Sequence, residues 1–233
     1  MATYYSPRSV VDGLVMFLDA GNTKSYPGSG SAWTNLANTS RNAIIRGTPT
    51  FSSSYKGAIT TPADQVATYI ELPESVLQNL TNGYVWTMTW ALTVLSLTGT
   101  RYGPHMTVGG GNDFIWMWNG DNTCQLYAVG PYTGSNPTWA LNTPLVLTLT
   151  RNSSDWRIYK NGVFSGAYSQ AASDTKTITG WIADQEQDVV KGGFDGSQNL
   201  NANWHFFSFY DRIITDTEIR QNYNAIKGRL GLT

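Results

Sequence analysis

A run of alternating carboxylates is the closest approach to a glycosidase active site in this sequence. Asp184, Glu186 and Asp188 stand two residues apart, and alternate residues of a strand share one face at a spacing of about 6.6 Å. Hydrolysis of a glycosidic bond needs two carboxyl groups about 5–5.5 Å apart for retention, or about 6.5–9.5 Å apart for inversion. The spacing is compatible with that chemistry. However, Gln185 and Gln187 make the other face polar as well, so we expect a solvated loop.

The same three carboxylates are candidate ligands for calcium, because hard cations bind carboxylate and carbonyl oxygens. Two other oxygen-rich sets compete with them, Asp19 with Asn22, and Asp113 with Asn119 and Asp121. Side-chain bonding to the backbone of a turn is the ordinary explanation for the first set. None of the sets matches an EF-hand loop. We expect no resident cofactor, with calcium as the open alternative.

Nucleophilic catalysis has little support among the residue types. Cys124 is the only cysteine, which excludes an intrachain disulfide and a multi-cysteine metal site. It has no histidine partner nearby in the sequence, so we expect a small buried apolar residue. His105 follows a Gly-Pro pair and is expected in a turn, whereas His205 lies inside an expected strand. We therefore predict that the protein is not an enzyme.

Aromatic and amide side chains gather in the middle of the chain, where they could bind a sugar or a protein. Sugar binding needs aromatic faces for stacking, surrounded by amide and carboxyl groups that bond hydroxyls. Trp116 is expected in the core, whereas Trp118 is followed by a turn, which leaves both a core role and a ligand role open. Trp139 is the best candidate for an exposed aromatic side chain. The candidate ligand-binding residues, for a glycan or a protein interface, are Trp118, Asn119, Asp121, Tyr132 and Trp139.

Short runs typical of β-strands, separated by glycine-rich and asparagine-rich turns, must position these residues. The expected strands are residues 13–20, 69–72, 84–95, 114–118, 145–150, 156–159, 163–164 and 204–214. Asn161-Gly162 between two of these runs supplies the positive φ angles that a tight hairpin requires. Many short strands with such turns predict an all-β antiparallel sandwich.

A single short helix is expected near the C-terminus. Thr215 and Glu218 have the spacing of a capping box. Ile219, Tyr223 and Ile226 then recur at helical spacing and give the helix one apolar face. No linker or internal repeat divides the chain. We predict an N-terminal arm over residues 1–12 and one domain over residues 13–233.

Motifs at both ends of the chain resemble a known family. The opening run, residues 13–22, is followed by a Ser-Tyr-Pro-Gly-Ser-Gly segment at 25–30 and by Trp-Thr-Asn-Leu at 33–36. The hairpin at 158–162 and the closing strand and helix at 209–223 follow in the expected order. These motifs resemble laminin-G-like, concanavalin A-like jelly-roll domains, of the kind encoded by tailed bacteriophages. One loop departs from the family pattern, because residues 37–43 lack the glycines that many relatives carry there.

The resemblance implies a concanavalin A-like jelly roll with a C-terminal helix, in the setting of a virion. The function expected from it is a non-enzymatic accessory structural protein, either a capsid decoration, a fibre or a tail-associated module. Such a protein acts in particle docking or surface adhesion. The alternative is a lectin-like carbohydrate-binding module for host-surface glycans, and a glycan hydrolase is the remaining reading. Expected partners are other virion structural proteins, or surface glycans under the alternative, and a homo-oligomer is left open.

Composition excludes several other classes of protein. The 233-residue chain has a net charge of -1 and only 13% charged residues, against about 25% in an average domain. It therefore lacks the basic footprint of a nucleic-acid binder. No apolar run approaches the roughly 18 residues of a membrane span, and the N-terminus has no apolar signal segment. We therefore expect synthesis in a host cytoplasm, and the resemblance implies a place in the virion.

Overall fold

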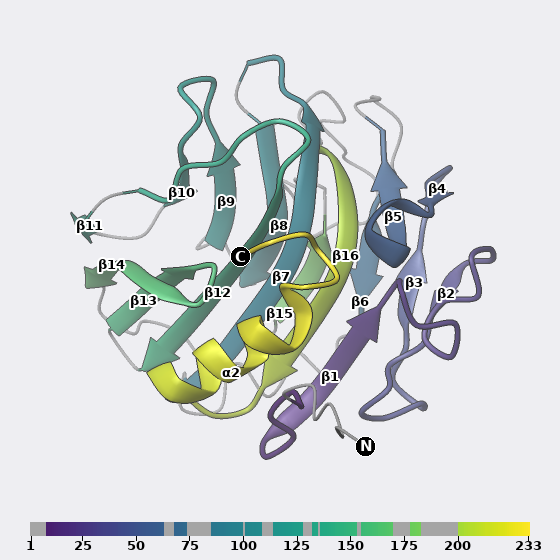
Figure 1. The fold of residues 1–233 in the computed structure, drawn as a ribbon, viewed down its shortest axis with the longest axis horizontal. Helices are drawn as coiled ribbons and strands as arrows, with labels where there is room; N and C mark the ends of the chain where they lie inside the picture. Colours follow the sequence, from purple (N-terminus) through teal and green to yellow (C-terminus); the bar gives the residue numbers. More distant parts are fainter. Residues whose placement is uncertain are drawn as a thin grey trace.

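The computed structural model places the described residues in two facing antiparallel sheets, with an α-helix near the C-terminus (Figure 1). It describes residues 8–62, 68–73, 85–99, 101–108, 114–127, 132–134, 136–152, 155–169, 178–182 and 200–233. The prediction of an all-β sandwich with a short C-terminal helix is confirmed. No helix within these ranges has the length and apolar character needed to cross a membrane.

Within the described residues, one sheet has nine strands and the other has seven. The nine-stranded sheet contains, in spatial order, β11 (Tyr132–Gly134), β14 (Val163–Ser169), β13 (Asp155–Lys160), β12 (Pro144–Asn152), β7 (Val85–Ser96), β16 (Asn201–Tyr210), β5 (Ala58–Thr61) and β4 (Thr50–Ser52), with β1 (Leu14–Asp19) paired to β16. The seven-stranded sheet contains β10 (Cys124–Tyr127), β9 (Phe114–Trp118), β8 (Arg101–Val108), β15 (Ile178–Ile182), β6 (Ile70–Leu72), β3 (Ala43–Ile45) and β2 (Ala32–Trp33). A short 3-10 turn, η1 (Ser54–Lys56), precedes β5, and the helix α2 (Asp216–Ile226) follows β16.

The main core lies between the two sheets and is rich in tryptophan. On β7, Trp86, Met88 and Trp90 share the inward face, as the alternation of the sequence predicts. Trp33 on β2 and Trp118 on β9 belong to the same cluster from the seven-stranded sheet. Burying such large rings removes much apolar surface from water and holds the two sheets together.

A second apolar layer covers the outer face of the nine-stranded sheet. Figure 1 shows α2 and the C-terminal tail lying across this face. Tyr223 and Ile226 of the helix pack with Val146 of β12 and Phe206 of β16. Threonine hydroxyls beneath this layer are satisfied within the sheet, since Thr89 and Thr148 bond each other at 2.9 Å across β7 and β12. The amphipathic helix therefore closes the outer face of a sheet whose inner face already holds the core.

The tight hairpin between β13 and β14 forms as the sequence predicts. Asn161 and Gly162 have φ values of 50° and 77°, the positive region required of both central residues in the favoured two-residue turn. A Cβ added at Gly162 would lie 2.9 Å from Cβ of Tyr223 on α2. Glycine is needed here both for backbone conformation and for the close approach of the helix.

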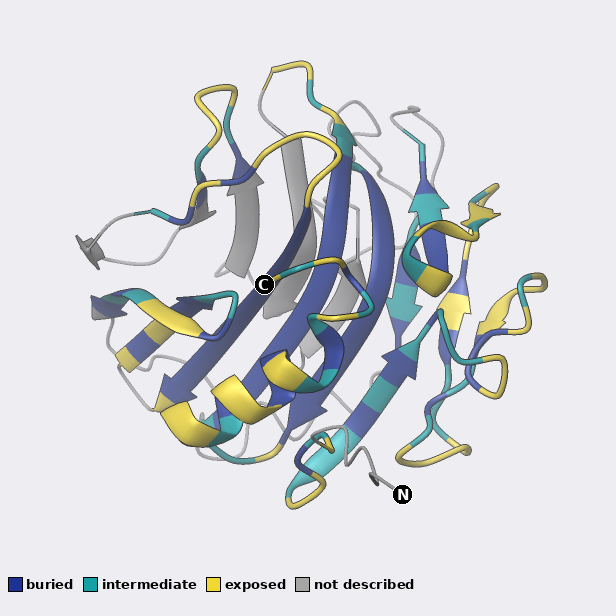
Figure 2. Ribbon diagram, viewed as in Figure 1, coloured by how far each residue is buried: buried dark blue, intermediate teal, exposed yellow. Residues whose placement is uncertain are grey.

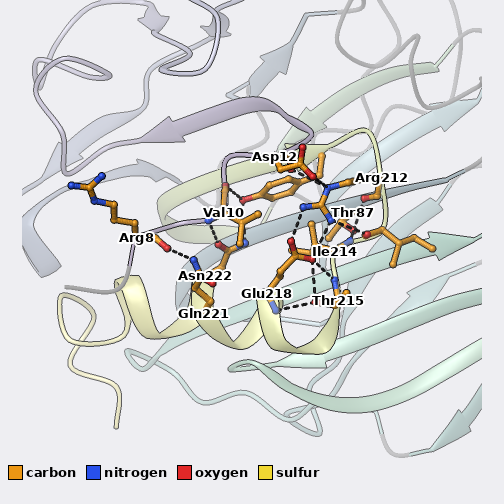
Figure 3. A network of polar contacts seen from close by, with 12 residues as sticks. Arg8, Val10, Asp12, Thr87, Arg212, Ile214, Thr215, Glu218, Gln221 and Asn222 are labelled. Atoms are coloured by element: carbon orange, nitrogen blue, oxygen red, sulfur yellow. Dashed lines mark hydrogen bonds and ion pairs between the residues drawn. The ribbon is translucent and has the colours of Figure 1, made fainter. Parts of the chain in front are cut away.

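Residues 8–12, the described part of the predicted arm, lie against β16 and α2. The Val10 amide donates to Oδ1 of Asn222 at 2.8 Å, and the Tyr210 hydroxyl donates to the Val10 carbonyl at 2.9 Å. Gln221 Nε2 donates to the Arg8 carbonyl at 2.7 Å. Figure 3 shows these contacts side by side. The segment therefore joins the start of the chain to its last strand and helix.

The start of α2 is held by a capping box and an ion pair that share one carboxylate (Figure 3). The Glu218 carboxylate accepts a hydrogen bond from the Thr215 backbone amide at 2.7 Å. In return, the Glu218 backbone amide donates to the Thr215 hydroxyl at 3.3 Å. Arg212 Nη2 and Nη1 lie 2.7 and 3.1 Å from the two Glu218 oxygens. The hydrogen bond from Arg212 is the main reason that the pKa of Glu218 is lowered to about 2.

We expect Glu218→Ala to lower the free energy of unfolding by about 1–2 kcal/mol, the combined value of a helix cap and a bidentate surface ion pair. Because the pKa of Glu218 is lowered in the folded state, the ionised carboxylate contributes its full stability above pH 4.5. That contribution disappears as the pH falls toward 2. Urea denaturation at neutral pH measures the loss. Glu218→Gln, which keeps an acceptor for Thr215 without the charge, should lose less, and equal losses would contradict the role given to the ion pair.

Candidate functional site

Two loops meet at one end of the sandwich and form the candidate site. We call them the hairpin corner, which consists of residues 119–123 at the tip of the β9–β10 hairpin and residues 136–143 before β12. The Trp139 amide donates to the Asn122 carbonyl and the Cys124 amide donates to the Pro137 carbonyl, both at 2.9 Å. Thr123 and Thr138 form an isolated antiparallel bridge. Figure 2 shows both loops as largely exposed segments, at the upper left of the view.

Two tryptophans form the buried base of the hairpin corner. Trp118 is fully buried and Trp139 is 7% exposed, and their rings meet edge to face with centroids 5.9 Å apart. Trp139 Nε1 donates to the Thr123 carbonyl at 3.0 Å. The expectation of an exposed ring at Trp139 is therefore wrong, because the indole satisfies its N–H on the neighbouring loop and packs its ring on Trp118. Neither ring offers a free face for stacking, so their part in the site is to support the loops above them.

The exposed surface of the hairpin corner is polar. Asp121 Oδ1 accepts from the Thr123 amide at 3.0 Å and from the Thr123 hydroxyl at 2.6 Å. These two bonds hold the pKa of the Asp121 carboxyl below its usual value, so the side chain is ionised at neutral pH. Asn119 is half-buried, and its Nδ2 lies 3.4 Å from the Thr123 hydroxyl. The tip thus presents a carboxylate, an amide and a hydroxyl in a bonded set.

A cation borders this polar surface. Lys160, at the end of β13, donates from Nζ to the Thr138 hydroxyl at 2.8 Å. Asn122 and Asn142 both have positive φ values, 65° and 58°, a conformation that asparagine tolerates in turns. Leu141 is 48% exposed beside them. The corner therefore combines donors, acceptors and one large exposed apolar side chain.

Sequence reasoning missed Thr123, Thr138 and Lys160 as members of this site. An available signal was the Asp-Asn-Thr run at 121–123, because an Asp side chain commonly bonds the backbone two residues later in an Asx turn. Nothing comparable marked Thr138 or Lys160. Their place depends on the pairing of three segments that are distant in the sequence.

The remaining predicted site residues lie elsewhere or outside the description. Tyr132 begins β11 and pairs with Tyr168 of β14, and its side chain is outside the described part of the structure. Asp184, Glu186 and Asp188 fall in a segment outside the described residues, so their calcium or glycosidase role stays a prediction. Among the residues that the structure does describe, no three His, Cys, Asp or Glu side chains gather as a metal site would require.

The other candidate groups have local structural roles. Asp19 Oδ1 accepts from the Gly21 amide at 2.9 Å and from Arg229 Nη1 at 2.5 Å, so the turn reading of Asp19 is confirmed. Cys124 is buried, as predicted, with its thiol against the Pro137 carbonyl at 3.4 Å. Burial raises the pKa of this thiol, which makes it a poor nucleophile.

Comparisons with known proteins show similarity in fold. No protein-family model matches the chain, and no curated protein matches it significantly. Among solved structures, a Trypanosoma rangeli sialidase bound to 2,3-difluorosialic acid is 15% identical over 93% of this chain, with a TM-score of 0.68. The same sialidase bound to sialic acid gives 16% identity over 95% and a TM-score of 0.65. The chain spans about a third of the sialidase, since it covers 33% and 34% of those two chains.

A single domain gives a match over nearly its full length. Domain 4 of AbnA, an extracellular arabinanase from Geobacillus stearothermophilus in complex with arabinotriose, is 10% identical with a TM-score of 0.61. That match covers 90% of this chain and 98% of that domain. These neighbours are compatible with a concanavalin-like sandwich.

The expectation of a non-enzymatic virion accessory structural protein is contradicted by these neighbours. They are a sialidase and an arabinanase domain, whereas that expectation rested on the phage setting of the sequence resemblance. The motifs that carried the resemblance specify strands, turns and a helix. They identify a fold, and a fold is shared by proteins of unrelated function.

Proposed function

We propose that this chain is a carbohydrate-binding β-sandwich that binds neutral oligosaccharides at the hairpin corner without a chemical step. The observation that carries the proposal is the hydrogen-bonded set of an exposed Asp121 with the half-buried Asn119 and Thr123. The buried pair of Trp118 and Trp139 holds this set in place. The similar domain of an arabinanase, which is described in complex with arabinotriose, supports a carbohydrate as the ligand class.

The polar groups of the corner suit sugar hydroxyls. A carboxylate accepts hydrogen bonds from hydroxyls, and a bond to a charged group contributes more than a neutral one. The two bonds from Thr123 both reach Oδ1 of Asp121, so Oδ2 receives neither and can accept from a ligand. Because the loops are fixed by the tryptophan base, binding would order few side chains and would lose little entropy.

Asp121 in the hairpin corner and Lys160 at its border carry opposite charges and leave no net charge there, which suits a neutral ligand. Asp121 is ionised at neutral pH, since its pKa is lowered by the bonds from Thr123. A sialic acid carboxylate placed on this residue would meet a like charge. The proposal therefore separates this chain from the ligands named for the similar sialidase.

The proposal of binding without catalysis rests on the number of carboxylates at the corner. Glycosidases use two carboxyl groups on either side of the scissile bond. Asp121 is the only carboxylate within the hairpin corner. The catalytic alternative is tested by incubating the protein with each bound oligosaccharide, and release of shorter products would contradict a purely binding role.

We also propose that the sandwich is a laminin-G-like domain, a finer assignment than its fold class. The positions of the two end motifs in the fold support this assignment. The opening run forms β1, which pairs with β16 of the closing motif from Leu14–Tyr210 to Asp19–Phe206. Motifs at opposite ends of the chain therefore form neighbouring strands, which supports reading them together as the mark of one family.

We expect the double variant Asn119→Ala/Asp121→Ala to bind its best neutral oligosaccharide at least about tenfold more weakly, a change of about 1.4 kcal/mol. The protein is first clustered on beads and screened against immobilised neutral and sialylated glycans, because multivalency raises weak signals. Calorimetry then gives the affinity for the best ligand. A repeat with a chelator tests for calcium.

The matched control for this experiment is Asp155→Ala. Asp155 is an exposed aspartate at the opposite end of β13 from Lys160, so its loss changes the net charge without touching the corner. Unchanged affinity in the double variant, or preferred binding of sialylated glycans, would overturn the proposed site.

A further inference from the structure

An exposed aromatic ring does occur, at the edge of the nine-stranded sheet away from the hairpin corner. Phe51 lies on β4, the last strand of that sheet, and is 41% exposed. Tyr26 supports it from below, with ring centroids 5.9 Å apart and an angle of 48° between the planes. We call Phe51, Tyr26 and the loop of residues 27–31 the Phe51 platform.

The loop of the Phe51 platform brings bare backbone beside the ring. Gly28 and Gly30 have φ values of 95° and 94°, a region that glycine adopts readily and other residues avoid. A Cβ added at Gly28 would lie 3.6 Å from the Phe51 ring, whereas one at Gly30 would meet nothing within 4 Å. The backbone therefore runs close to the ring and stays open to solvent at Gly30.

Tyr26 fixes the geometry of both parts. It is 6% exposed, and its hydroxyl donates to the Gly30 carbonyl at 3.1 Å. The same side chain thus packs on the ring and anchors the loop. Residues 26–32 carry no charge. Ser29 and Ser31 are exposed, and their side chains carry hydroxyl groups.

The combination of features fits one chemical class of ligand. A sugar ring binds through its apolar C–H face on an aromatic side chain, while its hydroxyls bond nearby amides and hydroxyls. We propose that the Phe51 platform is a second contact for neutral oligosaccharides, with Phe51 as the stacking residue and the 27–31 loop as the source of hydrogen bonds. This inference rests on the proposed carbohydrate-binding function and adds a separate site to it.

A second half-exposed phenylalanine serves as a contrast. Phe164 on β14 is 51% exposed, but the Arg157 guanidinium lies over its ring at 5.8 Å and the Tyr159 ring packs edge-on to it at 5.6 Å. A sugar would have to displace a cation to stack there. Exposure alone therefore does not define a platform, and Phe164 is the matched control for Phe51.

Two contacts on different parts of the sandwich would change how the protein binds a surface. Figure 1 shows β4 and the β9–β10 hairpin at opposite sides of the molecule. A single short oligosaccharide would occupy one contact at a time. A surface that displays many glycan chains would engage both, which raises the apparent affinity without any new contact.

The test is an NMR titration of the isotope-labelled chain with arabinotriose, cellotriose and maltotriose as neutral probes. We expect the amide signals of Gly28 and Gly30 to shift with at least one probe. We expect Phe51→Ala to weaken that binding about fivefold or more and Phe164→Ala to leave it unchanged. The titration of the unsubstituted chain does not depend on whether either variant folds.

Each result decides between the two sites. Shifts confined to residues 119–123 would overturn the Phe51 platform and leave the hairpin corner standing. Shifts at Gly28 and Gly30 that are lost in Phe51→Ala, with residues 119–123 silent, would support the platform and overturn the corner. Signals that stay in place at both sites with all three probes would overturn both.

Discussion

Trp118→Ala should lower the free energy of unfolding by about 3–5 kcal/mol, the range for removing a large buried aromatic side chain. Trp118 is fully buried and belongs to the core between the sheets. It also supports the Trp139 ring under the hairpin corner. The substitution therefore leaves a cavity that borders both the core and the loops of the candidate site.

Urea denaturation monitored by circular dichroism measures this loss. Asp121→Ala is the comparison at the same corner, because Asp121 is exposed and its removal should change stability far less than the removal of Trp118. Trp118→Phe, which keeps an apolar ring, should retain most of the stability and the glycan binding. A Trp118→Ala protein as stable as the unsubstituted chain would contradict the core role of this ring.

Acidification from pH 7 to pH 4 should remove about 3 kcal/mol of stability through His205 alone. Burial lowers the pKa of His205 from 6.5 to about 4, helped by the nearby charge of Arg229, while the bond to the Gly57 carbonyl acts in the opposite direction. Between these two pKa values the unfolded chain binds a proton that the folded chain does not. Stability is therefore full above pH 6.5 and falls as the pH drops toward 4.

The surroundings of His205 explain why its neutral form is favoured. Nδ1 lies 3.3 Å from the Gly57 carbonyl, which can only accept, so Nδ1 carries the hydrogen and Nε2 accepts from the Thr93 hydroxyl at 2.8 Å. The Tyr55 ring packs edge-on against the imidazole at 5.4 Å. Arg229, which is paired to Asp19, supplies the nearby positive charge. A second proton on the ring would face that charge and lose the bond from Thr93.

The measurement compares the unfolding free energies of the unsubstituted chain and His205→Gln from pH 7 to pH 4. Glutamine can keep one donor and one acceptor but does not titrate, so the variant should be less dependent on pH by about 3 kcal/mol over this range. Glu218→Ala is a useful second comparison, because the Glu218 window lies below pH 4.5. Equal pH slopes in the His205→Gln and unsubstituted proteins would contradict a buried neutral histidine.

Local patterns were sufficient for the framework of the fold. The alternation along β7, the Asn161-Gly162 turn and the Thr215–Glu218 capping box all appear as predicted. Each depends on residues within a few positions of one another, where side-chain periodicity and backbone sterics act directly. The sandwich class follows from the number of such strands and turns.

The exposure of individual aromatic rings could not be predicted in the same way. Trp139 is buried because the Thr123 carbonyl, 16 residues earlier, accepts its indole hydrogen bond, and because Trp118 lies beside it. Phe51 is exposed because its strand is the last of the sheet. Both outcomes depend on which distant segments become neighbours. The sequence pattern around each ring does not predict those neighbours.

The amino-acid sequence by itself therefore determined the strand and helix periodicities, the turns and the lack of a strong charge, all of which are local or compositional properties. Only the tertiary structure decided that the predicted tryptophans form a base under a polar corner, and that a phenylalanine on an edge strand offers the open ring. The physical reason is that burial is a property of packing between segments far apart in the chain, whereas propensity acts between neighbours.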